Sequence, residues 1–243
     1  MAGHSHWANI QRTKSKADAR RGRVFSKWAK LIASAARVGG GDPDANLKLR
    51  YAIERARLDN MPKDSIDRAI KKGTGELGGA APEEVLYEGY GPGGVAILIE
   101  ALTDNRARTA PDLRMMMERA GGNLAAAGAV AWLFERKATF ALQRRAVSED
   151  EIMEWALEIG AEDVSTEEPE IYGVTADPAQ FITIKTALER KGWKIEDAAL
   201  RYVPKNMVAV DAETGRRLTD LIDTLEDYED VQAVHTNADF AAA

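Results

Sequence analysis

A glycine-rich stretch, GTGELGGAAP at positions 73–82, divides the sequence into two parts with different hydrophobic periodicity. Before it, apolar residues such as Trp28, Leu31 and Ala35 recur at the spacing of an amphipathic helix. After it, short apolar runs are separated by turn residues, which is typical of strands. The composition of the stretch is that of a flexible linker. The sequence therefore predicts a small helical bundle over residues 1–77, followed by mixed helix and sheet.

The second part predicts two α+β units. Strands on both sides of a Gly-rich turn, a helix capped by Thr109 and a strand reading AVAWLFE come first. Residues 137–204 then follow βαββαβ order, the ferredoxin-like pattern, which is complete in itself. The later strand MVAV, a helix at 212–226 and the strand VQAVH have no partners of their own. We expect them to return to the sheet of residues 85–135.

The expected fold class is therefore multidomain α and α+β. It consists of an N-terminal helical bundle and an α+β domain that carries an inserted ferredoxin-like βαββαβ domain. The expected boundaries are 1–77 for the bundle, 78–136 plus 205–243 for the split domain, and 137–204 for the insertion.

The segment GYGPGG at 89–94 matches the dinucleotide-binding pattern G-x-G-x-x-G as text. That motif needs a strand before it and a helix N-terminus after it to hold a pyrophosphate. Here the strand VAILIEAL follows and Pro92 lies inside the turn, so we expect a hairpin loop.

Charge is distributed very unevenly along the chain. Residues 1–72 hold 17 Lys and Arg against 7 Asp and Glu, a net charge of +10, although the whole chain has a net charge of −6. The remaining 16 basic and 32 acidic residues give −16. This asymmetry is typical of a polyanion-binding module joined to domains that do not bind polyanions directly.

A row of cations lies along the first predicted helix, with its members spaced alternately four and three residues apart. These members are Lys16, Arg20, Arg23, Lys27 and Lys30. At 100° per residue these side chains fall within about 80° of arc, away from the apolar stripe. Such a row contacts phosphates without reading sequence, and Trp7 is available to stack on a base. An anionic lipid surface and a solvated helix face are the alternatives. The predicted nucleic-acid-binding residues are His4, Trp7, Arg12, Lys14, Lys16, Arg20, Arg23, Lys27 and Lys30.

The loop LTDNRARTAPDLR at 102–114 leads into a capped helix and carries Arg106 and Arg108. Its arginines and the helix N-terminus suit a phosphate contact in a cleft. A structural ion-pair cluster with Asp104 explains the same residues equally well.

Catalysis finds little support in the sequence. The chain has no cysteine and only three histidines, so no nucleophile with a base and an orienting acid can be assembled. No metal site and no cofactor are expected. The rival hypothesis is an enzyme that acts on a phosphorylated small molecule in an interdomain cleft.

No apolar run approaches the roughly 20 residues of a membrane span, so no membrane partner is expected. The basic N-terminus shares features with a mitochondrial presequence, but its pattern continues into helices without a plausible cleavage point. The absence of cysteine fits a reducing cytosol. The acidic α+β domains are candidates for contact with a protein partner.

Several long segments closely resemble the YebC/PmpR family, and the likeness runs nearly end to end. They include MAGHSHWANIQRTKSKADARRGRVFSK, YEGYGPGGVAILIEALTDNRART, GGNLAAAGAVAWLF and LIDTLEDYEDVQAVHTNAD. Members are described as probable transcriptional regulatory proteins, and they include a mitochondrial translational activator of cytochrome c oxidase. The resemblance implies three domains, a cytoplasmic location, no known catalysis and no cofactor.

The resemblance leaves two targets open, promoter DNA and ribosomal RNA. Some members are described as DNA-binding regulators, others as ribosome-associated factors that help translation through consecutive prolines. The family's usual GHSKW has a lysine where this chain has His6, and its NIKHRK is NIQRTK here. Positive charge at the N-terminus is therefore lower, or pH-dependent at His6.

Overall fold

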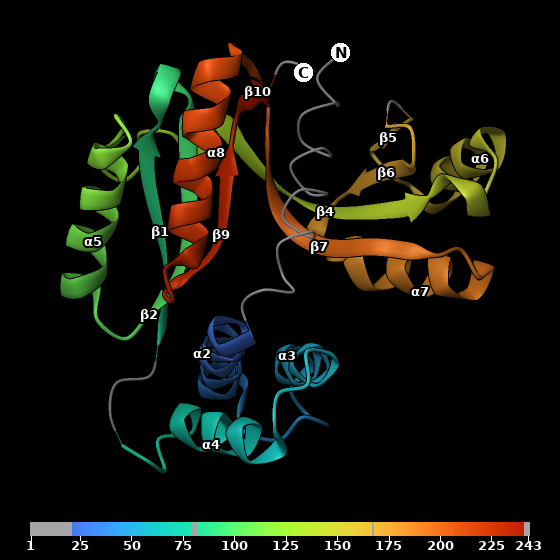
Figure 1. Ribbon diagram of the computed structural model, residues 1–243. Coiled ribbons are helices and arrows are strands. Elements are labelled where there is room, and N and C mark those ends of the chain that lie inside the picture. Colours follow the sequence, from blue (N-terminus) through green and yellow to red (C-terminus); the bar gives the residue numbers. More distant parts are fainter. Residues whose placement is uncertain (1–20, 79–81, 167, 241–243) are drawn as a thin grey trace. The chain divides into compact units, whose positions relative to one another are not determined.

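The computed structural model describes residues 21–78, 82–166 and 168–240 (Figure 1). These residues form two compact units, each made from separate stretches of the chain. One contains residues 21–131 and Asp211–Thr236, and the other contains Trp132–Val210 and residues 237–240. The protein is thus a multidomain α+β protein of helices and mainly antiparallel sheets, and this general fold class is the one that the sequence predicts.

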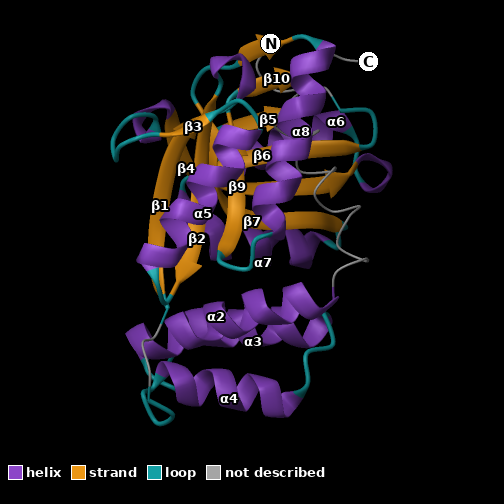
Figure 2. Ribbon diagram, turned by 60° about the vertical axis from the view of Figure 1, so that its left-hand side comes forward, coloured by secondary structure: helices purple, strands orange, loops and turns teal. Residues whose placement is uncertain are grey.

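The N-terminal part of the first unit is a three-helix arrangement in which α2 packs against both α3 and α4 (Figure 2). The helices are α2 (Arg21–Gly39), α3 (Leu47–Leu58) and α4 (Lys63–Gly73). The Asn46 side chain caps α3 by accepting a hydrogen bond from Leu49 N at 3.1 Å. Ile32, Leu49 and Ala52 are fully buried at the centre, which confirms the apolar stripe read from the sequence.

Close approach of α2 and α4 depends on one glycine. A Cβ built on Gly73 would lie 2.3 Å from the carbonyl oxygen of Ala33 and 2.8 Å from the Ala36 Cβ. No side chain fits at that distance from a backbone oxygen, so the last turn of α4 is in direct backbone contact with α2.

The sheet of the first unit has the strand order β3-β1-β2-β9, and α5 and α8 cover one of its faces (Figure 2). Leu113 and Met117 of α5 and Leu218 and Leu225 of α8 are fully buried there. The elements are β1 (Glu83–Tyr90), β2 (Ala96–Thr103), α5 (Arg106–Arg119), β3 (Asn123–Leu124), α8 (Ala212–Asp227) and β9 (Val231–Thr236).

The GYGPGG segment connects β1 and β2, which pair antiparallel from Glu83↔Thr103 to Tyr90↔Ala96. It is a hairpin loop, as predicted, and Gly93 in it has φ 77°. The return of VQAVH to this sheet is also confirmed, because β9 pairs antiparallel with β2 from Ile97↔Thr236 onward.

Three local predictions are wrong. Asn105, not Thr109, caps α5, since its side chain accepts a hydrogen bond from Arg108 N at 3.1 Å. AVAWLFE is not one strand: a 3₁₀ turn at Ala131–Leu133 precedes a strand that begins at Phe134. MVAV does not join the first sheet, because β8 (Val208–Val210) pairs parallel with β10 (Ala238–Phe240).

The second unit contains a four-stranded sheet with the order β5-β6-β4-β7. Alternate residues of β4, such as Phe140 and Leu142, face a core that also receives Trp155 from α6 and Ile184 from α7. Both helices therefore cover the same face of this sheet. The elements are β4 (Phe134–Gln143), α6 (Glu149–Ile159), β5 (Asp163–Ser165), β6 (Ile171–Ala176), α7 (Phe181–Lys191) and β7 (Ile195–Pro204).

Glu88 of β1 holds the segment between β3 and the 3₁₀ turn. Its carboxylate accepts hydrogen bonds from the backbone N–H groups of Gly128 at 2.6 Å and of Val130 and Ala131 at 2.7 Å. Burial opposes ionisation of the side chain, but these three donors outweigh it and hold the pKa of Glu88 below its usual value. The carboxylate is thus an internal anchor for a loop that has little regular structure.

Replacing Glu88 by glutamine is expected to lower the free energy of unfolding by about 2 kcal/mol, because an amide nitrogen cannot accept these bonds. The loss should appear in urea titration, and amide exchange should accelerate at Val130 and Ala131. Glu84→Gln, at an exposed position four residues earlier on the same strand, is the matched control. Equal stability of the two variants would contradict the anchoring role.

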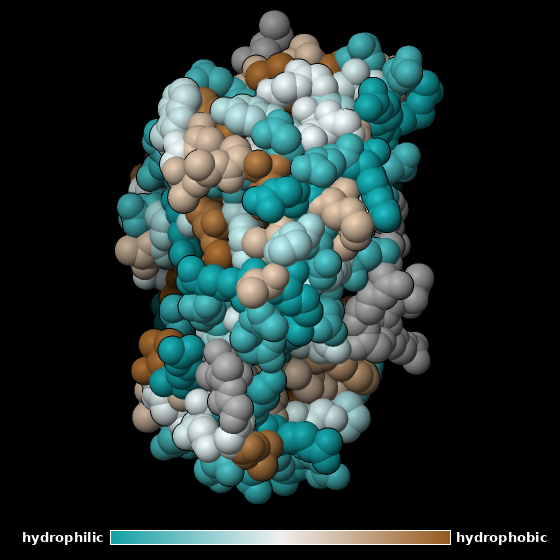
Figure 3. All heavy atoms as spheres, turned by 90° about the vertical axis from the view of Figure 1, so that its left-hand side faces the viewer, coloured by the Kyte–Doolittle hydropathy of each residue, from teal (hydrophilic) through white to brown (hydrophobic). Residues whose placement is uncertain are grey.

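On the face shown in Figure 3, hydrophilic side chains dominate and apolar atoms form small separate patches. A face of this kind offers no large apolar docking surface. Among the residues that the structure describes, no helix combines the length and hydropathy needed to cross a membrane.

Candidate nucleic-acid interface

The predicted phosphate-binding row lies only in part within the described residues. Arg23 belongs to α2, where the helical backbone is described, and Lys27 and Lys30 follow it at one-turn intervals. Outside the described residues lie His4, Trp7, Arg12, Lys14, Lys16 and Arg20.

The helical part of the first unit is basic even without that N-terminal segment. Residues 21–78 contain 13 Lys and Arg against 7 Asp and Glu, a net charge of +6. Most of these cations are exposed, among them Lys48, Arg57, Lys63 and Lys71. The surface therefore carries the positive potential that attracts a polyanion.

Lys27 reaches the C-terminal end of α8, and Lys30 reaches the turn that follows it before β9. Lys27 Nζ donates to the backbone carbonyl of Glu226 at 2.9 Å. Lys30 Nζ donates to the Asp230 carboxylate, lies 3.4 Å from Glu229 Oε1, and keeps only 14% of its side chain exposed. In this conformation the two lysines hold α2 to the end of α8 and the acidic turn after it.

Asp230 is the centre of this contact, and its side chain is completely buried. Besides Lys30, it accepts hydrogen bonds from Thr109 Oγ1 at 2.6 Å, from Arg108 Nη2 at 2.9 Å and from Thr103 Oγ1 at 3.2 Å. Its backbone oxygen accepts from Leu102 N at 2.7 Å. We call these residues the Asp230 cluster: Lys30, Thr103, Arg108, Thr109 and Asp230.

The cluster keeps Asp230 ionised. Burial alone would raise its pKa, but hydrogen bonds from Lys30, Thr109 and Arg108 hold that pKa below the ordinary value of 3.8. The bond to Asp230 in turn raises the pKa of Arg108. Beside the cluster, burial and a hydrogen bond donated to Asp112 at 2.6 Å raise the pKa of Tyr228 to about 12.

The two loop arginines have carboxylate partners. Arg106 makes a bidentate contact with Glu83, at 2.5 Å from Nε and 2.9 Å from Nη2. Arg108 bridges Asp230 and Asp104. The structure thus contains the ion-pair arrangement that the sequence left open, although its main acceptor is Asp230 and not Asp104.

Sequence reasoning missed Asp230 and the two threonines. Thr103 and Thr109 are fully buried, and their hydroxyl oxygens are 2.8 Å apart. A single acid in the exposed-looking run EDYED carries no local sign of burial. Within residues 21–78, 82–166 and 168–240 no cluster of three or more His, Asp or Glu is arranged to hold a metal ion.

Two family models match this chain and together cover most of it. The model described as the TACO1/YebC protein N-terminal domain matches residues 5–76, and the one described as the TACO1/YebC second and third domain matches residues 82–238. The unmatched positions between them fall in the glycine-rich stretch.

Similar proteins are named probable transcriptional regulatory proteins. One from Treponema denticola is 52% identical over 98% of this chain and 96% of its own length. One from Geobacter sulfurreducens is 48% identical over 99% of this chain and 97% of its own length. The crystal structure of a conserved hypothetical protein from Aquifex aeolicus is 44% identical and covers 98% of both chains with a TM-score of 0.86. The chain therefore belongs to the TACO1/YebC family.

Proposed function

We propose that this protein is a non-enzymatic regulator of gene expression that binds nucleic acid phosphates through its N-terminal basic helix and the segment preceding it. The observation that carries the proposal is the net charge of +10 on residues 1–72 of an acidic chain. It is supported at the family level by relatives named as transcriptional regulators. Basic side chains spaced one helical turn apart neutralise phosphates and release counterions on binding.

The contacts of Lys27 and Lys30 divide the predicted row into two parts. The cations from Arg12 to Arg23 are proposed as the primary phosphate contacts. Lys27 and Lys30 join them only if a phosphate replaces the Glu226 carbonyl and the Asp230 carboxylate. The bulk of the binding free energy is therefore assigned to the N-terminal side of the row.

Both nucleic-acid targets, promoter DNA and ribosomal RNA, present phosphates, so the cation row does not choose between them. The names of the relatives favour DNA. A role on the ribosome predicts instead that RNA is recovered with the protein from cells. No cofactor is part of the proposal, and the site of action is proposed to be the cytoplasm.

The domain organisation proposed for this function is a basic bundle, a split α+β domain and an inserted ferredoxin-like domain. Residues 132–136, 205–210 and 237–240 are assigned here to the inserted domain, because they belong to its compact unit. The strand order β5-β6-β4-β7, with both helices on one face, supports the ferredoxin-like assignment. The two acidic domains are proposed to contact a protein partner, for which their excess of carboxylates is the support.

Charge reversal at Arg12, Lys16 and Arg20 is expected to weaken nucleic-acid binding about 100-fold at 0.1 M salt, since three phosphate contacts become repulsions. These substitutions leave the Lys27 and Lys30 contacts intact. Fluorescence anisotropy with a 20-base-pair duplex and a single-stranded RNA of equal length measures the change. For about six neutralised phosphates, the wild-type log–log salt slope is expected to be about −4 on a single strand and about −5 on duplex DNA.

The matched control reverses Arg145, Arg190 and Lys194 to Glu, three exposed cations of the second unit. It changes the net charge equally but leaves the N-terminal row unaltered. If both triple variants weaken binding equally, the overall charge of the protein determines the affinity. The assignment of binding to the N-terminal row is then overturned. Undetectable wild-type binding to both probes would overturn the proposed function.

A further inference from the structure

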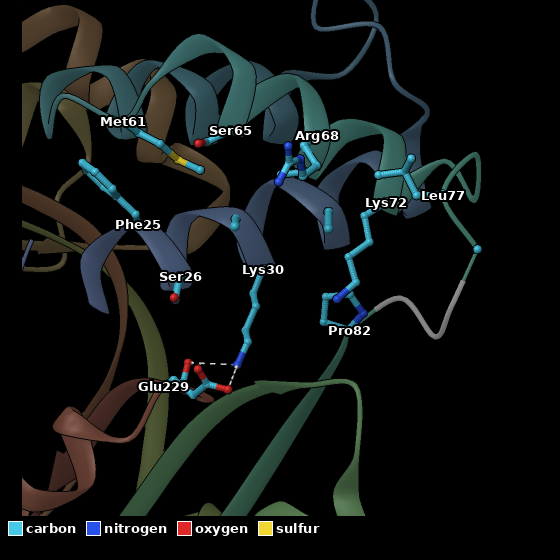
Figure 4. A pocket seen from close by; sticks show the side chains of 14 residues that line it. Phe25, Ser26, Lys30, Met61, Ser65, Arg68, Lys72, Leu77, Pro82 and Glu229 are labelled. Atoms are coloured by element: carbon cyan, nitrogen blue, oxygen red, sulfur yellow. Dashed lines mark hydrogen bonds and ion pairs between the residues drawn. The ribbon is translucent and has the colours of Figure 1, made fainter. Parts of the chain in front are cut away.

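A pocket of about 530 Å³ opens between α2 and α4 (Figure 4). Its volume lies within the range of small-molecule sites. It is lined by Phe25, Ser26, Ala29, Lys30, Ala33, Met61, Ser65, Arg68, Ala69, Lys72, Leu77, Gly78, Pro82 and Glu229.

The two ends of this pocket differ in chemistry. Phe25 and Met61 lie together at one end, and Arg68 and Lys72 extend from α4 toward the other (Figure 4). Phe25 is half-buried against the bundle core and keeps part of its ring available to the pocket. An aromatic and thioether wall suits a flat apolar group, whereas two cations four residues apart suit an anion.

The cations at the anionic end are only weakly compensated. Lys72 Nζ is 3.4 Å from Asp104 Oδ2, and both side chains are substantially exposed, which makes this ion pair weak. For Arg68, no carboxylate within the described part of the chain lies at ion-pair distance. Lys30 is already bound to Asp230 and Glu229 and adds no free charge. The pocket therefore carries a net positive charge from Arg68 and Lys72.

We propose that this pocket binds one unpaired nucleotide, with its phosphate against Arg68 and Lys72 and its base against Phe25 and Met61. A nucleotide joins a flat aromatic base to an anion, which is the combination that the two ends match. Bases inside a duplex are stacked and cannot reach such a wall without being flipped out. For a nucleotide within a strand the inference rests on the proposed function, and for a free nucleotide it does not.

The test uses anisotropy with a labelled ten-nucleotide oligouridine and an oligoadenine of equal length, and calorimetry with adenosine monophosphate. Arg68→Gln is expected to weaken binding of both strands about five- to tenfold, through loss of a charged phosphate contact. Phe25→Leu keeps an apolar side chain in the bundle and is expected to weaken it to a similar extent, since base stacking is lost. A bromouridine strand should crosslink to peptides that contain Phe25 or Met61.

Lys71→Gln is the matched control, because it removes one charge from the same helix at an exposed position that does not line the pocket. It should change single-strand affinity less than twofold. If Arg68→Gln and Lys71→Gln weaken single strands equally, the pocket proposal is overturned and the proposed function stands.

The proposed function can also fail while the pocket proposal stands. If adenosine monophosphate binds with an affinity that depends on Arg68 and Phe25 while no strand or duplex binds, the pocket is supported for free nucleotides and the proposed function is overturned. Absence of binding by every probe would overturn both. The circular dichroism spectrum of each variant must match that of the wild-type protein, so that a loss of binding is not a loss of folding.

Discussion

Replacing Asp230 by alanine is expected to lower the free energy of unfolding by about 3 to 4 kcal/mol, because Lys30 and Arg108 lose the buried carboxylate that they share. Urea titration followed by circular dichroism measures the loss. In native-state hydrogen exchange, amide protection should fall most in α2, α5 and β9, the elements that Asp230 connects. Glu229→Ala is the control: this neighbouring acid is exposed and 3.4 Å from Lys30, so its loss should cost less than about 1 kcal/mol.

The Asp230 carboxylate also makes the stability of the protein depend on pH. Its folded-state pKa is held below 3.8, so the stabilisation is fully present above the unfolded-state pKa and is lost as pH falls through the folded value. The difference in unfolding free energy between wild type and Asp230→Asn should therefore be constant from pH 8 to pH 5 and shrink below about pH 4. A difference that grows on acidification would contradict an ionised Asp230.

Replacing Gly73 by valine is expected to destabilise the bundle by about 3 kcal/mol, because the new side chain would collide with the Ala33 carbonyl and Ala36. The α4 helix must then move away from α2, which also deforms the pocket between them. Single-strand binding that depends on Arg68 should fall together with stability.

Lys71→Ala, on the exposed side of α4, controls for helix propensity and should change stability by less than about 0.5 kcal/mol. Gly73→Ala, with one added carbon, should fall between the two. If Gly73→Val were as stable as Lys71→Ala, the close backbone contact of α2 and α4 would not exist in solution.

Elements that depend on local pattern could be predicted from the sequence. The helices of the bundle follow an apolar stripe at helical spacing, and the hairpin at 89–94 follows from Pro92 and its glycines. The second sheet follows from alternation, since Ala138, Phe140 and Leu142 share one face. Each of these signals lies within about 20 residues of chain.

Features that depend on distant residues could not be predicted. The spacing of Lys27 and Lys30 places them on one side of α2, but nothing local shows that Asp230, 200 residues after Lys30, lies opposite. Thr109 has a side chain that can cap a helix, yet it is buried within α5. There it donates a hydrogen bond to Asp230, 121 residues later in the chain. β8 pairs with β10 through residues at the extreme end of the described chain.

The pairing of β2 with β9 also bears on how the protein is made. β2 is nearly all apolar and buried, and one of its two neighbours in the sheet is the last long strand of the chain. At a synthesis rate of 5 to 20 residues per second, Lys30 precedes Asp230 by about 10 to 40 s on the ribosome. During that interval Asp230 is not yet available to Lys30, and one edge of β2 is uncovered. The nascent protein is therefore more cationic and more aggregation-prone before Asp230 and β9 are synthesised than after.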